Sequence, residues 1–256
     1  MSFAVVRVPA APVRRKAKHQ AEMVNQLLFG EMVRIVKEKK RMWLKVRSLH
    51  DGYEGWLTST MLEVVKEEET RIPVEYITTT PFTKIIVADQ SMWIPAGACL
   101  PLLTASGEGM IGHIPYRLEG TATRKSVVPF DTEMLLQATM PWLNAPYLWG
   151  GRTVLGVDCS GFVQVIFRQL GIDLSRDAWQ QAQEGQTVNR LKEARPGDLA
   201  FFDDRDEIVH VGILLPEGKI IHAAGRVRID AIDKKGIIHA ETGKRTHSLR
   251  VIKRSW

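Results

Sequence analysis

Residues 156–163, Gly156-Val157-Asp158-Cys159-Ser160-Gly161-Phe162-Val163, place a cysteine at the predicted start of an apolar helix. Asp158 is suited to cap this helix, and apolar residues recur at helical spacing until Gly171 ends it. The pattern predicts a helix over residues 159–170. A thiol at a helix N-terminus faces unpaired N–H groups and the positive end of the helix dipole, which favour the thiolate. Taken alone, Cys159 would be interpreted as a buried structural cysteine, but residues further along the chain favour a nucleophile.

The composition is that of a folded protein. The 256 residues are 45% hydrophobic and 25% charged, which is enough for two or three domains. The only cysteines, Cys99 and Cys159, suit a reducing compartment with one reactive thiol. If Met1 is the native start, no secretion signal precedes the chain, and no segment reaches transmembrane length, so we expect a cytoplasmic protein that is not bound to a membrane. The net charge of +6 is dispersed, so we expect no nucleic-acid partner.

The N-terminal half is rich in short strand-like segments. Strands are predicted near residues 3–8, 32–36, 43–46 and 54–57, with a helix or helical turn within 18–29, which suggests a small barrel. The charge run Lys66-Glu67-Glu68-Glu69 interrupts the pattern, and a second set of short apolar segments follows between residues 74 and 112. We predict domains at 1–66, 67–125 and 126–256.

The C-terminal domain begins with helices and ends with strands. A helical period over 129–143 precedes the cysteine segment, and strands are predicted at 198–202, 209–215 and 219–224. This order predicts an α+β fold.

Two histidines, His210 and His222, lie in strand-like runs. The connection Pro216-Glu217-Gly218 has the length of a three-residue hairpin loop, which places His222 opposite Gly212 and both imidazoles on one face. A two-residue loop would put them on opposite faces. On one face, His210 can accept the thiol proton while His222 orients it, and Gly212 would leave space for a substrate backbone. A zinc site is a weaker alternative because no fourth ligand is near.

Several motifs together resemble the NlpC/p60 family of bacterial cell-wall cysteine peptidases. They are Pro146-Tyr147-Leu148-Trp149-Gly150-Gly151, Asp158-Cys159-Ser160-Gly161-Phe162-Val163, Arg195-Pro196-Gly197-Asp198-Leu199 and the two histidine segments. The resemblance implies a papain-like catalytic domain with Cys159 as nucleophile, His210 as general base and His222 as the third member of the triad. It also implies that the Tyr147 hydroxyl and the backbone N–H of Cys159 stabilise the oxyanion. No cofactor or metal is expected.

The segments at 26–31 and 51–57 resemble those of bacterial SH3-like domains, and we expect a tandem pair of such barrels before the catalytic domain. This architecture resembles that of γ-D-glutamyl-L-diamino acid endopeptidases, which cleave stem peptides that begin with a free L-Ala. The resemblance implies that Asp177 binds the substrate amine together with Tyr53 and Glu22, with Glu31 as the alternative to Glu22. The other predicted substrate-binding residues are Ser160, Arg176 and Trp149.

The leading hypothesis is a cysteine endopeptidase of peptidoglycan peptide recycling. Its partner would be a murein peptide, cleaved between γ-D-Glu and diaminopimelate or lysine. The alternatives are a secreted wall-cleaving hydrolase or amidase targeted by its SH3-like domains, and a non-enzymatic module that binds wall fragments.

Overall fold

The structure is a computed structural model that describes residues 2–39, 42–125 and 130–256. The chain divides into two compact units: unit 1 contains residues 1–126 and 149–154, and unit 2 contains residues 127–148 and 155–256. The predicted domain boundary at residue 126 and the predicted helix start at Pro129 lie outside the described residues. In the part of the chain that the structure describes, none of the helices combines the length and the apolar character needed to cross a membrane.

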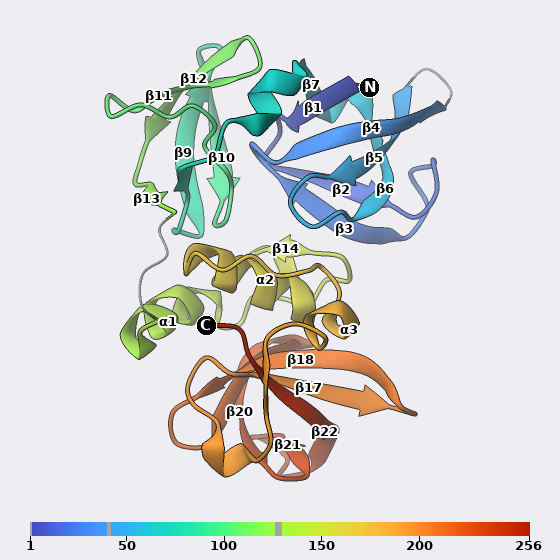
Figure 1. Cartoon of the computed structure of the whole chain (residues 1–256), viewed down its shortest axis with the longest axis vertical. Helices are drawn as coiled ribbons and strands as arrows, with labels where there is room; N and C mark the ends of the chain where they lie inside the picture. The colour runs from blue at the N-terminus through green and yellow to red at the C-terminus, as the bar shows by residue number, and fades with distance from the viewer. Residues whose placement is uncertain (1, 40–41, 126–129) are drawn as a thin grey trace. The chain divides into compact units, whose positions relative to one another are not determined.

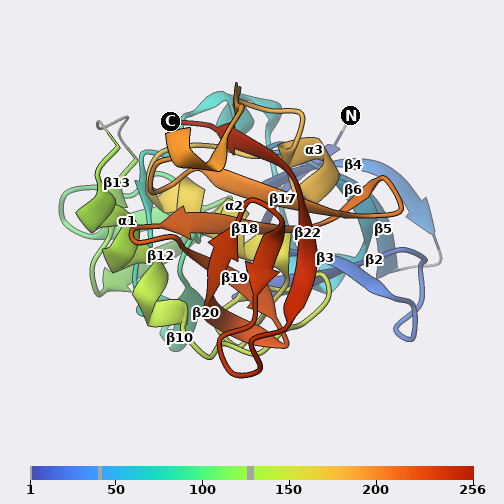
Figure 2. The ribbon, with the colours of Figure 1, turned by 90° about the horizontal axis from the view of Figure 1, so that it is seen from below.

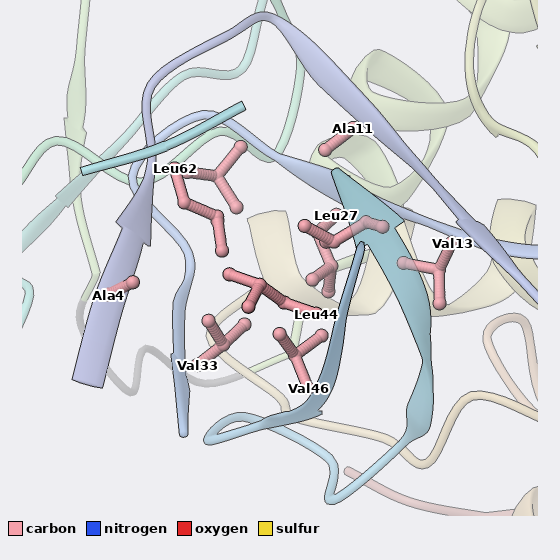
Figure 3. Packing of buried hydrophobic residues seen from close by; sticks show 10 residues of the cluster. Ala4, Ala11, Val13, Leu27, Val33, Leu44, Val46 and Leu62 are labelled. Carbon is pink, nitrogen blue, oxygen red and sulfur yellow. The ribbon is translucent and has the colours of Figure 1, made fainter. Parts of the chain in front are cut away.

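The first sheet of unit 1 is antiparallel, in the order β3-β2-β6-β5-β4-β1-β7 (Figure 1). Its strands are β1 (Ser2–Val6), β2 (Ala10–Arg14), β3 (Met23–Leu28), β4 (Met32–Lys39), β5 (Trp43–Ser48), β6 (Glu54–Thr58) and β7 (Leu62–Val65). Apolar side chains of these strands meet in one core, among them Leu27, Val33, Leu44, Val46 and Leu62 (Figure 3). Each such side chain contributes about 1.5–3 kcal/mol when it is buried. The four predicted strands of this region are confirmed.

The helix or helical turn predicted within residues 18–29 is wrong. Residues Met23–Leu28 form strand β3, which pairs with β2 so that Leu27 lies opposite Ala11. Met23, Leu27 and Leu28 have helical spacing, but Asn25 and Leu27 are buried with the period of a strand. Strand pairing with β2, which the sequence pattern did not predict, therefore decides the local structure.

A second antiparallel sheet in unit 1 has the order β10-β9-β12-β11. Its strands are β9 (Phe82–Val87), β10 (Gln90–Pro95), β11 (Glu108–Ile111) and β12 (Ile114–Glu119); β8 (Tyr76–Ile77) and β13 (Thr123–Arg124) form a separate pair. Tyr116 is buried and its hydroxyl donates to the Pro101 carbonyl over 2.9 Å. A Cβ at Gly109 would lie 2.2 Å from the Tyr116 ring, so this strand needs glycine there. The charge run before this sheet forms a single 3-10 turn, Glu67–Arg71.

Residues 149–154, which lie between the predicted tyrosine and cysteine of the catalytic domain, belong to unit 1. Strand β14 (Arg152–Thr153) is part of this segment. The Arg152 guanidinium is fully buried and donates to both carboxylate oxygens of Glu31 over 2.9 Å, and to the Gln26 carbonyl. Trp149 Nε1 donates to Glu22 Oε1 over 2.9 Å. A buried bidentate ion pair thus holds this segment within unit 1.

Unit 2 combines helices with an antiparallel sheet, as predicted. The helices are α1 (Thr132–Thr139), α2 (Cys159–Gln169) and the short α3 (Ala178–Gln181); the 3-10 turn Met140–Trp142 extends α1. The strands are β15 (Gly156–Val157), β16 (Gln186–Val188), β17 (Leu199–Asp204), β18 (Glu207–Leu215), β19 (Lys219–Ala224), β20 (Arg226–Asp233), β21 (Gly236–Ile238) and β22 (Arg245–Arg254).

The sheet of unit 2 closes on itself. Its order is β16-β22-β17-β18-β19-β20-β21, and an additional pairing joins β21 to β22. Figure 2 labels five of these strands, β17 to β20 and β22. Ala200, Phe202, Leu214, Ile220 and Ile252 pack together inside this curved sheet. The predicted strands at 198–202, 209–215 and 219–224 correspond to β17, β18 and β19.

Candidate active site

Helix α2 begins at Cys159, as predicted. Asp158 caps it, because its Oδ1 accepts a hydrogen bond of 2.7 Å from the backbone N–H of Gly161. Residues 159–168 of the helix are buried, and Gly171 follows with a φ of 81° that ends the helix at the expected place. The helix therefore fixes the cysteine at the start of a rigid, buried element.

A buried network surrounds the start of α2. Arg176 is 1% exposed and donates to Asp158 Oδ2 over 2.6 Å and to Asp158 Oδ1 over 3.0 Å. It also donates to Ser160 Oγ over 2.9 Å. Both side chains contact Asp158, which caps the cysteine helix, directly or through one another. We therefore attribute to Arg176 the positioning of this helix end. The predicted substrate contacts of Arg176 and Ser160 stay a prediction.

The thiol of Cys159 is buried. Burial, followed by the negative charge of Asp158, raises the pKa of the thiol to about 12, although backbone hydrogen bonds from Val211 and Ser160 and the charge of Arg176 oppose this. Burial thus opposes the stabilisation that the start of a helix gives to a thiolate. The expected preference for thiolate stays a prediction.

Strands β18 and β19 have the predicted register. Gly212 pairs with His222 and Leu215 with Lys219, so the loop has the expected three residues. His210 Nε2 lies 2.8 Å from His222 Nδ1, and both side chains are buried. His210 directly precedes Val211, whose backbone hydrogen-bonds to the Cys159 thiol. The structure thus brings the thiol to the strand that carries the predicted base.

Gly212 has a different role from the one expected. A Cβ at this position would lie 2.8 Å from the His222 Cβ and 2.8 Å from Ile220. The space beside this glycine is filled by His222 and Ile220, and so it does not admit a substrate backbone as predicted. Gly212 instead allows His222 to pack close to β18.

Tyr147 lies near the cysteine at the entrance to β15. Its backbone N–H donates to the Gly225 carbonyl over 3.0 Å, and its side chain is half-buried. Burial, followed by the charges of Cys159 and Asp158, raises the pKa of its hydroxyl. Tyr147 is therefore a protonated hydrogen-bond donor at neutral pH, which is what the predicted oxyanion role needs.

Asp177 precedes α3 and caps it. Its side chain and that of Gln180 form a capping box, in which Gln180 Oε1 accepts from the Asp177 backbone N–H over 3.2 Å. The carboxylate is thus fixed at the start of a helix. Its predicted contact with a substrate amine remains a prediction.

The other predicted amine-binding residues belong to unit 1. Glu22 forms an ion pair of 2.7 Å with Arg15 and accepts from Trp149. Glu31, the alternative to Glu22, is buried and bound bidentately by Arg152, so of the two carboxylates Glu22 is the one exposed to solvent. Tyr53 is half-buried in the turn before β6, with its backbone N–H bonded to Asp51.

Two residues that the sequence did not reveal complete the histidine cluster. His247 of β22 stacks on His210 with ring centroids 4.3 Å apart and an angle of 23°. Asp230 of β20 lies behind His222, with its Oδ2 3.0 Å from His222 Nε2. The sequence held one signal for Asp230. Charged Arg228 and Asp230 flank apolar Ile229, so on a strand the two charged residues share one face. Among the described residues, no group of three or more histidine, cysteine or acidic side chains is placed to hold a metal ion.

The pH dependence of turnover follows from the burial of His210. Burial, followed by the charges of His222 and His247, holds the pKa of His210 well below its usual range. The base therefore stays unprotonated in mild acid, and we expect the acid limb of kcat/KM to lie below about pH 6. Initial rates between about pH 4 and pH 8 would check this. An acid limb near pH 6.5 or above would contradict it.

Stability has to be measured over the same range. The unfolded chain binds a proton at His210 below about pH 6.5, whereas the folded protein does not until a lower pH. The free energy of unfolding therefore has its full value above the pKa that His210 has in the unfolded chain, and it falls as the pH drops below that pKa. Circular dichroism at each pH would separate loss of structure from protonation of the base.

Two family models match the chain. Residues 144–246 match the NlpC/P60 family, and residues 13–62 match the bacterial dipeptidyl-peptidase SH3 domain. The chain is 31% identical over 214 residues, 78% of its length and 71% of the relative, to the γ-D-glutamyl-L-lysine dipeptidyl-peptidase of Bacillus subtilis. It is 26% identical over 260 residues, 88% of its length and 75% of the relative, to the protein of the same name from Bacillus cereus.

Solved structures show the same fold. An NlpC/P60 family protein from Bacillus cereus aligns with a TM-score of 0.81 and 22% identity over 99% of each chain. An NlpC/P60 endopeptidase from Photobacterium damselae aligns with a TM-score of 0.70 and 15% identity over 97% of this chain and 70% of that one.

A cysteine at the start of a buried helix, beside a strand that carries a hydrogen-bonded histidine pair, defines a cysteine peptidase. This chain belongs to the NlpC/P60 family, with a bacterial dipeptidyl-peptidase SH3 domain before the catalytic domain.

Proposed function

We propose that the protein is an endopeptidase that hydrolyses the bond from γ-D-Glu to a diamino acid, diaminopimelate or lysine, in murein peptides with a free N-terminal L-Ala. The observation that carries this is the similarity to a γ-D-glutamyl-L-lysine dipeptidyl-peptidase over 214 residues, more than the catalytic domain alone. We further propose that the enzyme acts in the cytoplasm on recycled peptides and that the sheet of residues 82–119 is a second SH3-like domain. The two cysteines of the chain form no disulfide, which suits a reducing compartment.

In the proposed reaction, His210 removes the thiol proton as Cys159 Sγ attacks the γ-carbonyl carbon of D-Glu. The oxyanion receives hydrogen bonds from the Cys159 backbone N–H and the Tyr147 hydroxyl. His210 then protonates the leaving amine as the C–N bond breaks, which leaves a thioester on Cys159. Water, deprotonated by His210, attacks this thioester, and L-Ala-γ-D-Glu leaves as the thiol is regenerated.

Selectivity for a free amine would come from the Asp177 carboxylate, which is fixed at a helix start. A cationic amine pairs with this carboxylate, whereas an acylated amine would bury it without a cation. The L-Ala of intact wall is acylated, so this proposal separates a recycling enzyme from a wall-cleaving hydrolase.

The test compares L-Ala-γ-D-Glu-meso-diaminopimelate with its N-acetylated twin by mass spectrometry. We expect kcat/KM to be at least about 100-fold higher for the free amine. Equal cleavage of both peptides would instead support a wall hydrolase, and cleavage of neither would contradict the proposed substrate.

Asp177→Asn provides the matched variant. Asparagine caps a helix as well as aspartate does, so α3 should be retained while the negative charge is lost. We expect the preference for the free amine to shrink mainly through a higher KM. An unchanged preference would remove Asp177 from the amine site.

A further inference from the structure

A buried carboxylate lies behind the histidine pair. Asp230 is on β20, which pairs with β19 so that Ile220 lies opposite Asp230 and His222 opposite Arg228. The Asp230 side chain is 1% exposed, and its Oδ2 lies 3.0 Å from His222 Nε2. The three side chains of His210, His222 and Asp230 thus form one continuous buried chain of hydrogen bonds.

Asp230 is surrounded by hydrogen-bond donors. Its Oδ2 also accepts from Arg228 Nε over 2.8 Å, and its Oδ1 accepts from Arg228 Nη2 over 2.9 Å and from the Ala240 backbone N–H over 2.7 Å. Burial opposes the charge, but the hydrogen bonds from His222 and Arg228 outweigh it and hold the pKa of Asp230 below its usual range. An ionised carboxylate only accepts hydrogen bonds, so His222 Nε2 must carry a proton.

The tautomers of both imidazoles then follow. A neutral His222 with its proton on Nε2 has a lone pair on Nδ1, and this lone pair faces His210 Nε2 over 2.8 Å. His210 Nε2 must therefore carry a proton, which leaves the lone pair of His210 on Nδ1. That nitrogen is then the one able to take a proton from the thiol.

We propose that Asp230, held by Arg228, is a positioning residue that fixes the tautomers of His222 and His210 so that Nδ1 of His210 serves as the base. The proposal deepens the proposed function, because it rests on His210 as the base of that reaction. Arg228 balances the charge of Asp230, so the carboxylate acts by directing a hydrogen bond and adds little net negative charge to the site. Arg228 is itself fixed by a contact of 2.7 Å from its Nη1 to His239 Nε2.

The decisive variant is Asp230→Asn. The amide that replaces the carboxylate has one NH₂ group. This group must either face the donors on Arg228 and Ala240 or turn toward His222 Nε2. In the latter case it donates to Nε2, moves the His222 proton to Nδ1 and forces the His210 proton onto its own Nδ1. We expect kcat to fall by about 100-fold or more, with KM nearly unchanged, because a base in the wrong tautomer cannot accept the thiol proton.

The matched control is Asp233→Asn. Asp233 lies on the same strand and forms an ion pair with Arg245, but it is exposed and outside the histidine chain. We expect this variant to keep the wild-type kcat. A similar loss in both variants would mean that any lost carboxylate on β20 disturbs the fold, and would overturn the proposal.

A double-mutant cycle tests whether Asp230 acts through His222. In a His222→Gln background, the additional change Asp230→Asn is expected to alter kcat less than threefold, because the group it orients is gone. A full, independent loss in that background would show that Asp230 has only a structural role. Additive effects therefore contradict the assignment.

Nitrogen-15 NMR of histidine-labelled protein gives a readout that needs no substrate. In the wild type we expect both His222 and His210 to be protonated on Nε2, and in Asp230→Asn we expect His222 to be protonated on Nδ1. Protonation of wild-type His222 on Nδ1 would overturn the proposal even if the variant fails to fold. If the peptides are not cleaved but the tautomers behave as expected, the proposed substrate fails and the role of Asp230 stands.

Discussion

Cys159→Ala is expected to abolish peptide cleavage, with kcat reduced by about 10⁶-fold. Without the thiol no thioester can form, and the neighbouring Ser160 hydroxyl is held by Asp158 and Arg176. KM or the dissociation constant of the peptide should change little, because the substitution removes one buried atom that contacts the reacting carbon. The measurement is product formation by mass spectrometry together with peptide binding by calorimetry.

Cys99→Ala is the matched control, since Cys99 is the other cysteine of the chain. It lies in unit 1, where its backbone N–H donates to the Phe29 carbonyl over 2.9 Å, a contact that alanine keeps. We expect full activity in this variant. Residual turnover of Cys159→Ala above about 1% of the wild type would contradict covalent catalysis by this thiol.

Burial acts on both reacting groups of the site. It raises the pKa of the Cys159 thiol to about 12 and holds the pKa of His210 well below its usual range. Both shifts act against the charged forms, thiolate and imidazolium. In the proposed reaction, His222 and Asp230 contribute by holding the accepting ring in one orientation.

Local patterns in the sequence predicted the geometry that depends on a few neighbouring residues. The capping of α2 by Asp158 and the three-residue loop before Lys219 are of this kind, and both the helix start and the hairpin register agree with the structure. The pairing of His210 with His222 follows from that register. Such features need no knowledge of distant strands.

Features that depend on distant segments were not predicted. Residues 23–28 form a strand because they pair with β2, and the ion pair of Arg152 with Glu31 joins residues far apart in the sequence. Asp230 and His247 come from strands that carry no recognised motif. The pKa of the Cys159 thiol could not be predicted, because the position of the thiol at a helix start is visible in the sequence, whereas its burial, which raises this pKa, is not.

Arg176→Met is expected to destabilise unit 2 by about 3–5 kcal/mol. The variant removes the cation that binds both oxygens of Asp158, while the carboxylate stays buried at the start of the cysteine helix. It also removes a positive charge that lowers the pKa of the Cys159 thiol, so we expect kcat to fall in the molecules that remain folded. Urea denaturation monitored by circular dichroism gives the loss of stability.

Two further variants decide whether burial of the unpaired Asp158 charge causes the loss of stability in Arg176→Met. Arg226→Met breaks the exposed ion pair of Arg226 with Glu241 and is expected to cost less than about 1 kcal/mol. Adding Asp158→Asn to Arg176→Met removes the buried charge but keeps a residue that can cap α2, so the double variant should be more stable than Arg176→Met alone. If the double variant is instead less stable, Arg176 contributes mainly by packing. In that case the position of Cys159 depends on the shape of the arginine side chain rather than on its charge.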